Sequence, residues 1–464
     1  MSFSTAFCRR GPHGRALAAV LAVAVVASAS AAAAAPVATL SSSETARSDQ
    51  ARLSGTGTNL LRVDNGVIVV SNADLGSSAV TYIDIETLDV RAQQVVSGPT
   101  AAQGRRLAVI DVAGESAVEQ GLVEDPSTPV LRLLTLPEAD GEGFTEASAA
   151  VLPAAVAPSI QRFGTAIALG GNAIAVVSET TQRSDRVDIF TVTFDGRLRW
   201  AQQLEIGSAG EQRRSAALLQ TNVAVSSSGA VIAASGVNRL AGSGEVAIFR
   251  IGTNGWIPTQ RFVRIGGGPV VVDGERVVVQ RSSFFVRDSG PWTVLSTAPG
   301  RPFGTVEELP VEGSSISIWG NHVAVGDPDN DFVYLLELSS DTGSYRFSQA
   351  IPVPGGNPGS GSPRFGTSVV LVHDRLVVGA PDATAPYPAG AFHVFDVVEG
   401  PVGCTIVGTQ DDDDLRAPED RISNTVCGLA GADLLIASST TDRLDGGSGR
   451  DQCEGEADRI TNCE

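Results

Sequence analysis

The last part of the sequence repeats acidic side chains and glycines in a nine-residue pattern. The sixth positions of successive nonapeptides are Asn424, Asp433, Asp442 and Asp451. The glycines of the same stretch are Gly428, Gly431, Gly446, Gly447 and Gly449. Proteins bind calcium through carboxylate and carbonyl oxygens, about six to eight for each ion. The residue types and their spacing make this segment the first candidate for a metal site.

The eighth positions of the same nonapeptides are Val426, Leu435, Leu444 and Cys453. Residues 446–454 thereby resemble the repeat of RTX, or hemolysin-type, calcium-binding proteins. The resemblance implies a parallel β-roll, in which each nonapeptide contributes one turn and one short strand. It also implies that Asp433, Asp451 and Asp442, together with the five glycines, bind calcium between coils. Asp433 and Asp451 lie 18 residues apart and would share the better edge, whereas Asn424 and Asp442 would share the other.

Four cysteines lie within the last 61 residues: Cys404, Cys427, Cys453 and Cys463. An even number clustered in a small segment indicates two disulfides and an exported protein. Three pairings are possible, and we favour Cys404–Cys427 with Cys453–Cys463 because both loops are short. Only two nonapeptides come close to the RTX consensus, so a disulfide-held cap without metal is the alternative to a calcium site.

These residues follow a long segment, 59–398, in which pairs of short apolar strands recur. The first strands of the pairs are 67–70, 107–110, 173–177, 231–234, 277–279, 323–325 and 376–378. Many are apolar on both faces, as expected of sheets packed between neighbouring sheets. The seven units, each of blade size, predict an all-β fold: a seven-bladed β-propeller followed by a small disulfide-stapled, β-roll-like tail. A β-sandwich pair or a β-helix is the structural alternative.

One unit carries a specific motif: Phe365-Gly366 is followed by the triplet Gly379-Ala380-Pro381. This unit resembles the FG-GAP repeat of integrin-type β-propellers. Weaker copies begin at Phe163-Gly164 and at Phe303-Gly304. The glycines would allow tight turns where the strands of a blade meet.

Motifs of common catalytic sites are missing from the sequence, including the G-x-S-x-G elbow, the H-E-x-x-H zinc helix and the P-loop. We therefore expect that the protein is not an enzyme and has no catalytic residue. His322, His373 and His393 are interpreted as structural. Trp200, Trp256, Trp292 and Trp319 recur at about blade intervals and are interpreted as packing residues, with a glycan-stacking platform as the alternative.

The first 35 residues have the pattern of a signal peptide: arginines, then an apolar core at 16–27, then small residues. Residues 36–58 are predicted to be a flexible linker, 59–398 the propeller and 399–464 the tail. The net charge of the 464-residue chain is −19, which disfavours nucleic acid as a partner. We expect that the mature chain has no membrane-spanning segment and that the protein is a monomer.

Together these features predict a secreted, extracellular, non-enzymatic binding or scaffolding protein. Its propeller would present a ligand face to an extracellular protein or polysaccharide, and its RTX-like tail would bind calcium. The alternative function is a secreted polysaccharide lyase or hydrolase with its site in the propeller channel. A third possibility is that the tail is an export or attachment signal.

Overall fold

The computed structural model describes most of the chain beyond residue 37. The described ranges are 38–47, 59–63, 66–72, 78–85, 90–96, 98–112, 128–137, 143–153, 157–181, 185–204, 218–238, 242–281, 290–296, 302–339, 342–353, 364–372, 375–382, 391–399, 404–408, 413–417 and 423–463. The predicted signal peptide lies outside them. Within these ranges the structure is almost entirely β-strand, with one short 3-10 helix at Ala157–Ser159.

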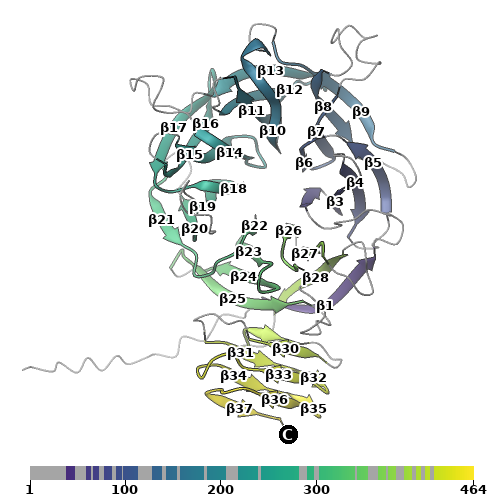
Figure 1. Ribbon diagram of the computed structural model, residues 1–464, viewed down its shortest axis with the longest axis vertical. Helices are drawn as coiled ribbons and strands as arrows, with labels where there is room; N and C mark the ends of the chain where they lie inside the picture. Colours follow the sequence, from purple (N-terminus) through teal and green to yellow (C-terminus); the bar gives the residue numbers. More distant parts are fainter. Residues whose placement is uncertain are drawn as a thin grey trace, which may run out of the picture. The chain divides into compact units, whose positions relative to one another are not determined.

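Antiparallel four-stranded sheets arranged in a ring form the larger part of the molecule (Figure 1). Six of these sheets consist of four consecutive strands each. In chain order the strands are β2 (Asn59–Val63), β3 (Gly66–Asn72), β4 (Ser78–Asp84), β5 (Val90–Val96); β6 (Thr100–Gln103), β7 (Arg106–Val112), β8 (Pro129–Thr135), β9 (Thr145–Ala150); β10 (Ile160–Gly170), β11 (Ala173–Thr180), β12 (Asp185–Val192), β13 (Leu198–Leu204); β14 (Leu218–Val225), β15 (Val231–Asn238), β16 (Gly244–Gly252), β17 (Gly255–Val263); β18 (Gly267–Asp273), β19 (Arg276–Arg281), β20 (Trp292–Ser296), β21 (Thr305–Glu308); β22 (Ser315–Trp319), β23 (His322–Asp327), β24 (Phe332–Leu338) and β25 (Tyr345–Pro352). The β-propeller prediction is confirmed in this arrangement.

The ring is completed by a composite sheet rather than by another run of four consecutive strands. Its order is β1-β28-β27-β26, with β26 (Ser368–Val372), β27 (Arg375–Ala380), β28 (Ala391–Glu399) and β1 (Ala38–Arg47). The prediction of seven blades is therefore not confirmed: six blades are complete in themselves, and the last sheet is a composite that takes one strand from the start of the chain. Residues 38–47, predicted to belong to a linker, form that strand, because pairing with β28 joins the two ends of the ring.

Burial follows from the stacking of the sheets. The second strands β11 and β27 are covered on both faces, so the first six residues of β11 and the last five of β27 are all buried. The outer strand β13 is exposed on one side, because its exposed residues alternate with buried or half-buried ones. The seven first strands expected from the sequence are these second strands, β3, β7, β11, β15, β19, β23 and β27.

The Phe-Gly pair of the motif-bearing unit lies at a joint between neighbouring sheets. Phe365 is fully buried, and its backbone N–H donates to Asp331 Oδ1 of the preceding blade at 2.9 Å. Gly366 has a φ of +92°, and a Cβ placed on it would lie 2.8 Å from the carbonyl oxygen of Phe332. Glycine is therefore required here by backbone conformation and by close approach together.

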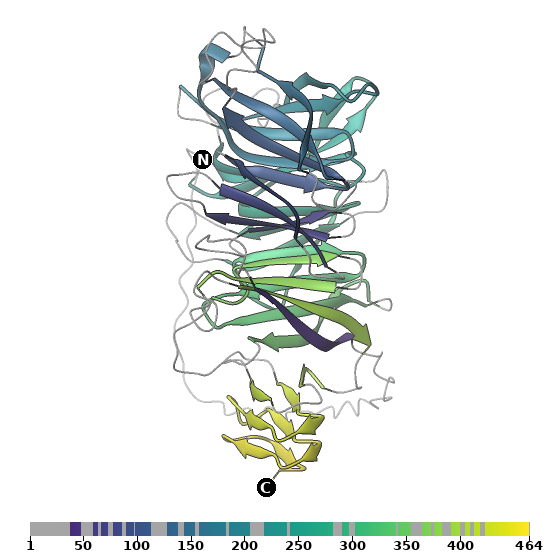
Figure 2. The ribbon, with the colours of Figure 1, turned by 90° about the vertical axis from the view of Figure 1, so that its right-hand side faces the viewer.

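The C-terminal segment is a coil of short parallel strands (Figure 2). One sheet contains β29 (Ile406–Val407), β31 (Thr425–Cys427), β34 (Arg443–Asp445) and β37 (Arg459–Thr461); a second contains β30 (Asp414–Arg416), β33 (Leu434–Ile436) and β36 (Gln452–Glu454); and the turn strands β32 (Ala430–Gly431) and β35 (Ser448–Gly449) pair with each other. Thr425 pairs with Arg443, and Leu434 with Gln452, so one coil takes 18 residues as the repeat predicts.

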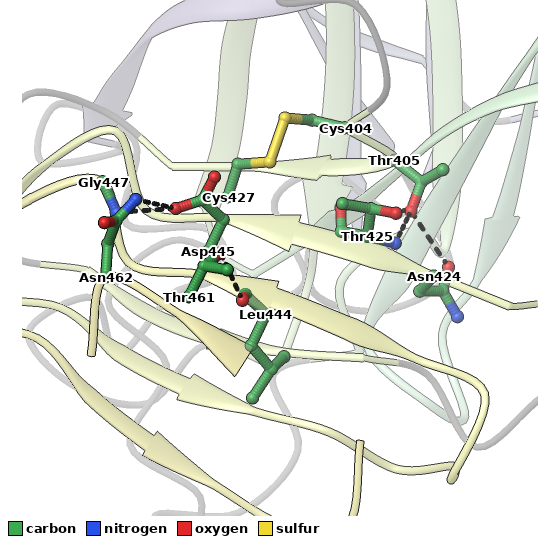
Figure 3. Close-up of a disulfide and its surroundings, with 10 residues drawn as sticks. All are labelled: Cys404, Thr405, Asn424, Thr425, Cys427, Leu444, Asp445, Gly447, Thr461 and Asn462. Carbon is green, nitrogen blue, oxygen red and sulfur yellow. Dashed lines mark hydrogen bonds between the residues drawn. A yellow bond between two sulfur atoms is a disulfide. The ribbon is translucent and has the colours of Figure 1, made fainter. Parts of the chain in front are cut away.

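A small core and two disulfides hold the coil together. The eighth-position residues Val426, Leu435 and Leu444 are buried between the two sheets. The predicted pairing is confirmed, with Cα–Cα distances of 5.9 Å for Cys404–Cys427 and 5.8 Å for Cys453–Cys463. The first disulfide joins Cys404, which precedes β29, to Cys427 in β31 (Figure 3), and the second joins Cys453 in β36 to Cys463, which follows β37. The covalent bonds therefore lie at the two ends of the coil. The Ala350 N–H of β25 donates to the Thr405 carbonyl at 2.8 Å, which ties the first coil to a propeller blade.

The Gly366 joint predicts a specific loss of stability. We expect Gly366→Ala to lower the free energy of unfolding by roughly 2 to 4 kcal/mol, because strain at positive φ and overpacking against Phe332 add together. Gly196→Ala is the matched control: its φ is +78°, but a Cβ there meets nothing within 4 Å, so the strain term alone, about 1 kcal/mol, applies. If chemical denaturation showed equal losses of unfolding free energy for the two variants, close packing at the Gly366 joint would not be responsible.

His393 predicts a pH dependence of the propeller. Burial lowers the pKa of His393 from 6.5 to about 4. Between these values the unfolded chain takes up a proton that the folded chain does not, so the free energy of unfolding falls as the pH falls from about 6.5 to 4. The total contribution is about 3 kcal/mol. The melting temperature should fall less between pH 7 and pH 4.5 for His393→Gln than for the wild type. Equal decreases in the two proteins would refute the role of His393 in this pH dependence.

Candidate functional site

The predicted metal edge of the coil is a ladder of buried aspartates. Asp433 and Asp451 are 1% and 3% exposed. Each accepts a backbone N–H from the preceding coil: Asp433 Oδ1 from Asp413 at 2.8 Å, and Asp451 Oδ1 from Asp433 at 3.0 Å. The backbone runs in parallel, since the Gln452 N–H donates to the Asp433 carbonyl at 2.7 Å. Two carboxylates are thus stacked one coil apart in a buried position, as the 18-residue spacing predicts.

Turn glycines lie directly beside these carboxylates. A Cβ on Gly446 would lie 2.7 Å from Asp451 Oδ2, and one on Gly428 would collide with Asp433 Oδ2. Gly447 and Gly449 have φ values of +85° and +150° and stack on the backbone of Leu429 and Gly431 in the preceding coil. A side chain at the first position of either turn would fill the space next to the acid.

The second edge is different, because protein donors surround its aspartate. Asp442 is fully buried, and its Oδ1 accepts the Asn424 N–H at 2.9 Å. Its Oδ2 accepts the backbone N–H groups of Ser438 at 3.1 Å and Ser439 at 2.9 Å. The partner residue Asn424 is a neutral amide, so the single negative charge of this edge already has three N–H donors. Asp442 therefore acts as the cap of its own turn, and we do not retain it as a ligand candidate.

Asp413 was not predicted as part of the site. It belongs to the same edge, because the Leu434 N–H donates to its carbonyl oxygen at 2.8 Å and Gly408 lies next to its Oδ2. Asp414 pairs with Leu434, a step of 20 residues rather than 18, so two extra residues shift this nonapeptide out of frame. Searching for a glycine five residues before an aspartate would have found it.

Carboxylates, histidines and cysteines do not gather in groups of three or more suited to a metal ion anywhere in the described ranges. A cation at the aspartate ladder would therefore depend on backbone carbonyls for much of its coordination. Calcium accepts such oxygens readily. Asp433, Asp451 and the turns that begin at Gly428 and Gly446 thus form a set that fits calcium in chemistry.

Polar side chains near the turns after the inner strands connect successive blades. Gln103 Nε2 donates to the Ser227 carbonyl at 2.7 Å, while its Oε1 accepts the Gly171 N–H at 2.5 Å. One side chain thereby links three blades. Arg106 Nη1 donates to Asn172 Oδ1 of the next blade at 3.2 Å. These contacts lie on the face of the ring that carries the turns between first and second strands.

The tryptophans serve mainly as packing residues, as predicted. Trp292 and Trp256 are buried and donate their indole N–H groups to the carbonyls of Gly313 and Gly229, each at 3.0 Å. Trp200 donates to Asp188 Oδ1 at 2.8 Å. Trp319 differs from the other three tryptophans in that the guanidinium of Arg62 lies 4.2 Å from the centre of its ring.

No protein-family model matches the chain, and no curated protein matches its sequence. Solved structures share its architecture at a distance. A hydrazine synthase of Kuenenia stuttgartiensis is 14% identical with a TM-score of 0.46 over 75% of this chain and 97% of that one. A chain of the mitotic checkpoint complex is 12% identical with a TM-score of 0.45, over 83% of this chain and 100% of that one. A prolyl endopeptidase is 13% identical with a TM-score of 0.42, over 70% of this chain and 45% of that one. We derive no function from similarities this low.

Within the described part of the chain, none of the helical residues forms a segment long and apolar enough to cross a membrane.

The second edge predicts a loss of stability that is independent of metal. We expect Asp442→Ala to lower the free energy of unfolding of the coil by about 3 kcal/mol, because one buried and two part-buried backbone N–H groups lose a charged acceptor. Asp458→Ala is the control: that carboxylate is 56% exposed and pairs with Arg443 at 3.2 Å, so its loss should cost below about 1 kcal/mol. Denaturation would be followed in the presence of a chelator. A loss seen for Asp442→Ala only when calcium is added would make Asp442 a ligand after all.

Proposed function

We propose that this chain is an extracellular binding protein, whose propeller presents a ligand surface and whose C-terminal coil binds calcium as an RTX-type roll. The observation that carries the calcium part is the stacking of buried Asp433 and Asp451 beside glycine turns. Export is supported by the signal-like first 35 residues and by the two disulfides, which persist in oxidising compartments.

The electrostatics of the aspartate ladder favour a cation. A buried carboxylate is costly unless it is paired or hydrogen-bonded, and like charges one coil apart oppose each other. Each Asp accepts a backbone N–H from the preceding coil through its Oδ1. A divalent ion held by the acids and by the carbonyls of the turns at 428–431 and 446–449 would offset both charges and clamp successive coils together.

One departure from the RTX repeat lies in the first of these turns. Leu429 stands where the repeat has its second glycine, and its φ is +75°. A leucine at positive φ is strained by about 1 to 3 kcal/mol. The strain is tolerated because the Leu429 carbonyl accepts the Ser448 N–H at 2.9 Å. Calcium would stabilise this turn further, so the coil is expected to be the part of the protein most sensitive to calcium.

Calorimetric titration of the purified protein with calcium tests the proposal. We expect saturable binding to wild type and its loss in Asp451→Asn, which keeps the size of the side chain and an oxygen that can accept the Asp433 N–H. Asp442→Asn is the matched control and should still bind. In thermal melts, calcium at a hundredfold excess over Kd should stabilise the wild type by about 2.7 kcal/mol. Absence of binding to wild type would leave a disulfide-held cap without metal.

A further inference from the structure

The Arg62–Trp319 pair connects two blades that are not neighbours in the ring. Arg62 lies in β2 and Trp319 at the end of β22, and both strands pack against β26 of the composite sheet between them. All three are inner strands, which face the middle of the ring in Figure 1. The guanidinium therefore extends past the β26 sheet to reach the indole, at 4.2 Å from the ring centre.

The described residues compensate the charge of Arg62 only in part. Burial lowers the pKa of Arg62, and the negative charge of Asp273 raises it in part. The carboxylate of Asp273, however, accepts a hydrogen bond from Arg276 at 2.9 Å, and Arg276 is also hydrogen-bonded to the Tyr345 hydroxyl at 2.7 Å. In the described part of the chain, no residue accepts a hydrogen bond from the Arg62 guanidinium, which has five N–H donors.

The cation–π contact holds the guanidinium over the indole and uses none of its N–H donors. A guanidinium edge matches a carboxylate, which accepts two parallel N–H···O bonds. Phosphate would bring a second negative charge close to Asp273 and into a protein of net charge −19, whereas a carboxylate brings one. The ligand chemistry that best satisfies this site is therefore a single planar carboxylate.

We propose that Arg62, held by Trp319, binds the carboxylate of an anionic ligand at the inner strands of the propeller. This inference deepens the proposed function and rests on it only in making the propeller the ligand-binding part. Two sources supply such a group: a uronic acid unit of an acidic polysaccharide, or a small free organic acid. They share the carboxylate and differ in the neutral sugar contacts that accompany it.

Calorimetry of the full-length protein separates these sources. The probes are galacturonate, the neutral sugar galactose, and acetate, so that each acid carries a single carboxylate. We expect galacturonate to bind saturably and galactose not to bind. Acetate binding with equal affinity would assign the site to organic acids, still through Arg62. Absence of binding by both carboxylates would overturn the proposal.

Variants test the role of the guanidinium itself. Arg62→Gln should weaken carboxylate binding at least tenfold, and Arg62→Lys, which keeps the charge but not the fork, should weaken it by an intermediate factor. Arg197→Gln is the matched control, an arginine that is 73% exposed and pairs with Asp195. Binding that is unchanged in Arg62→Gln would overturn the proposal and make the pair a structural brace. Calcium binding should be unaltered in these variants, so failure here is distinct from failure of the calcium proposal.

Discussion

The structure depends on one constraint: a sheet whose two faces are both apolar needs a neighbouring sheet on each side. The second strands of the blades, such as β11 and β27, are buried on both faces, so a linear stack would leave two apolar surfaces in water. Closing the ring removes both surfaces. Pairing of β1 with β28 joins the first and last parts of the propeller. The 10-residue strand β1 thereby completes the sheet formed by β26, β27 and β28.

The coil faces the opposite problem, because it is too small to stabilise itself by burial alone. Its core is one apolar residue per short strand, and it places Asn424, Asp433, Asp442 and Asp451 in buried positions. The cost of burying the three aspartates is offset by backbone N–H groups, and each aspartate accepts one of them from the preceding coil and so connects two coils. The disulfides fix the two ends of the coil, where a stack of coils has one neighbour instead of two.

Sequence periodicity predicted the parts of the fold in which each residue has one fixed environment. The second strands of the blades are continuous apolar runs, so their residue ranges could be predicted, and the sixth-position residues of the nonapeptides are all buried. The inner and outer strands were not predicted. β6 is the short run TAAQ and β9 is TEASAA, and neither has the composition of a buried strand. Their positions are set by the strands that they pair with, which a local pattern does not contain.

For the candidate site residues too, a local sequence pattern predicts some features and misses those that depend on the surrounding structure. The repeat places Asp442 and Asp451 at equivalent positions, yet one carboxylate accepts three backbone N–H groups and the other adjoins a glycine turn. The difference comes from the turn before each acid, since 438–441 contains serines and threonines and 446–449 mainly glycines. Arg62 and Trp319 are 257 positions apart, and only ring closure brings them together. The same closure that buries the apolar faces therefore also creates the position in which a guanidinium is held on an indole. The ligand surface that we propose at the inner strands would thus be a consequence of the ring as a whole rather than of any one repeat.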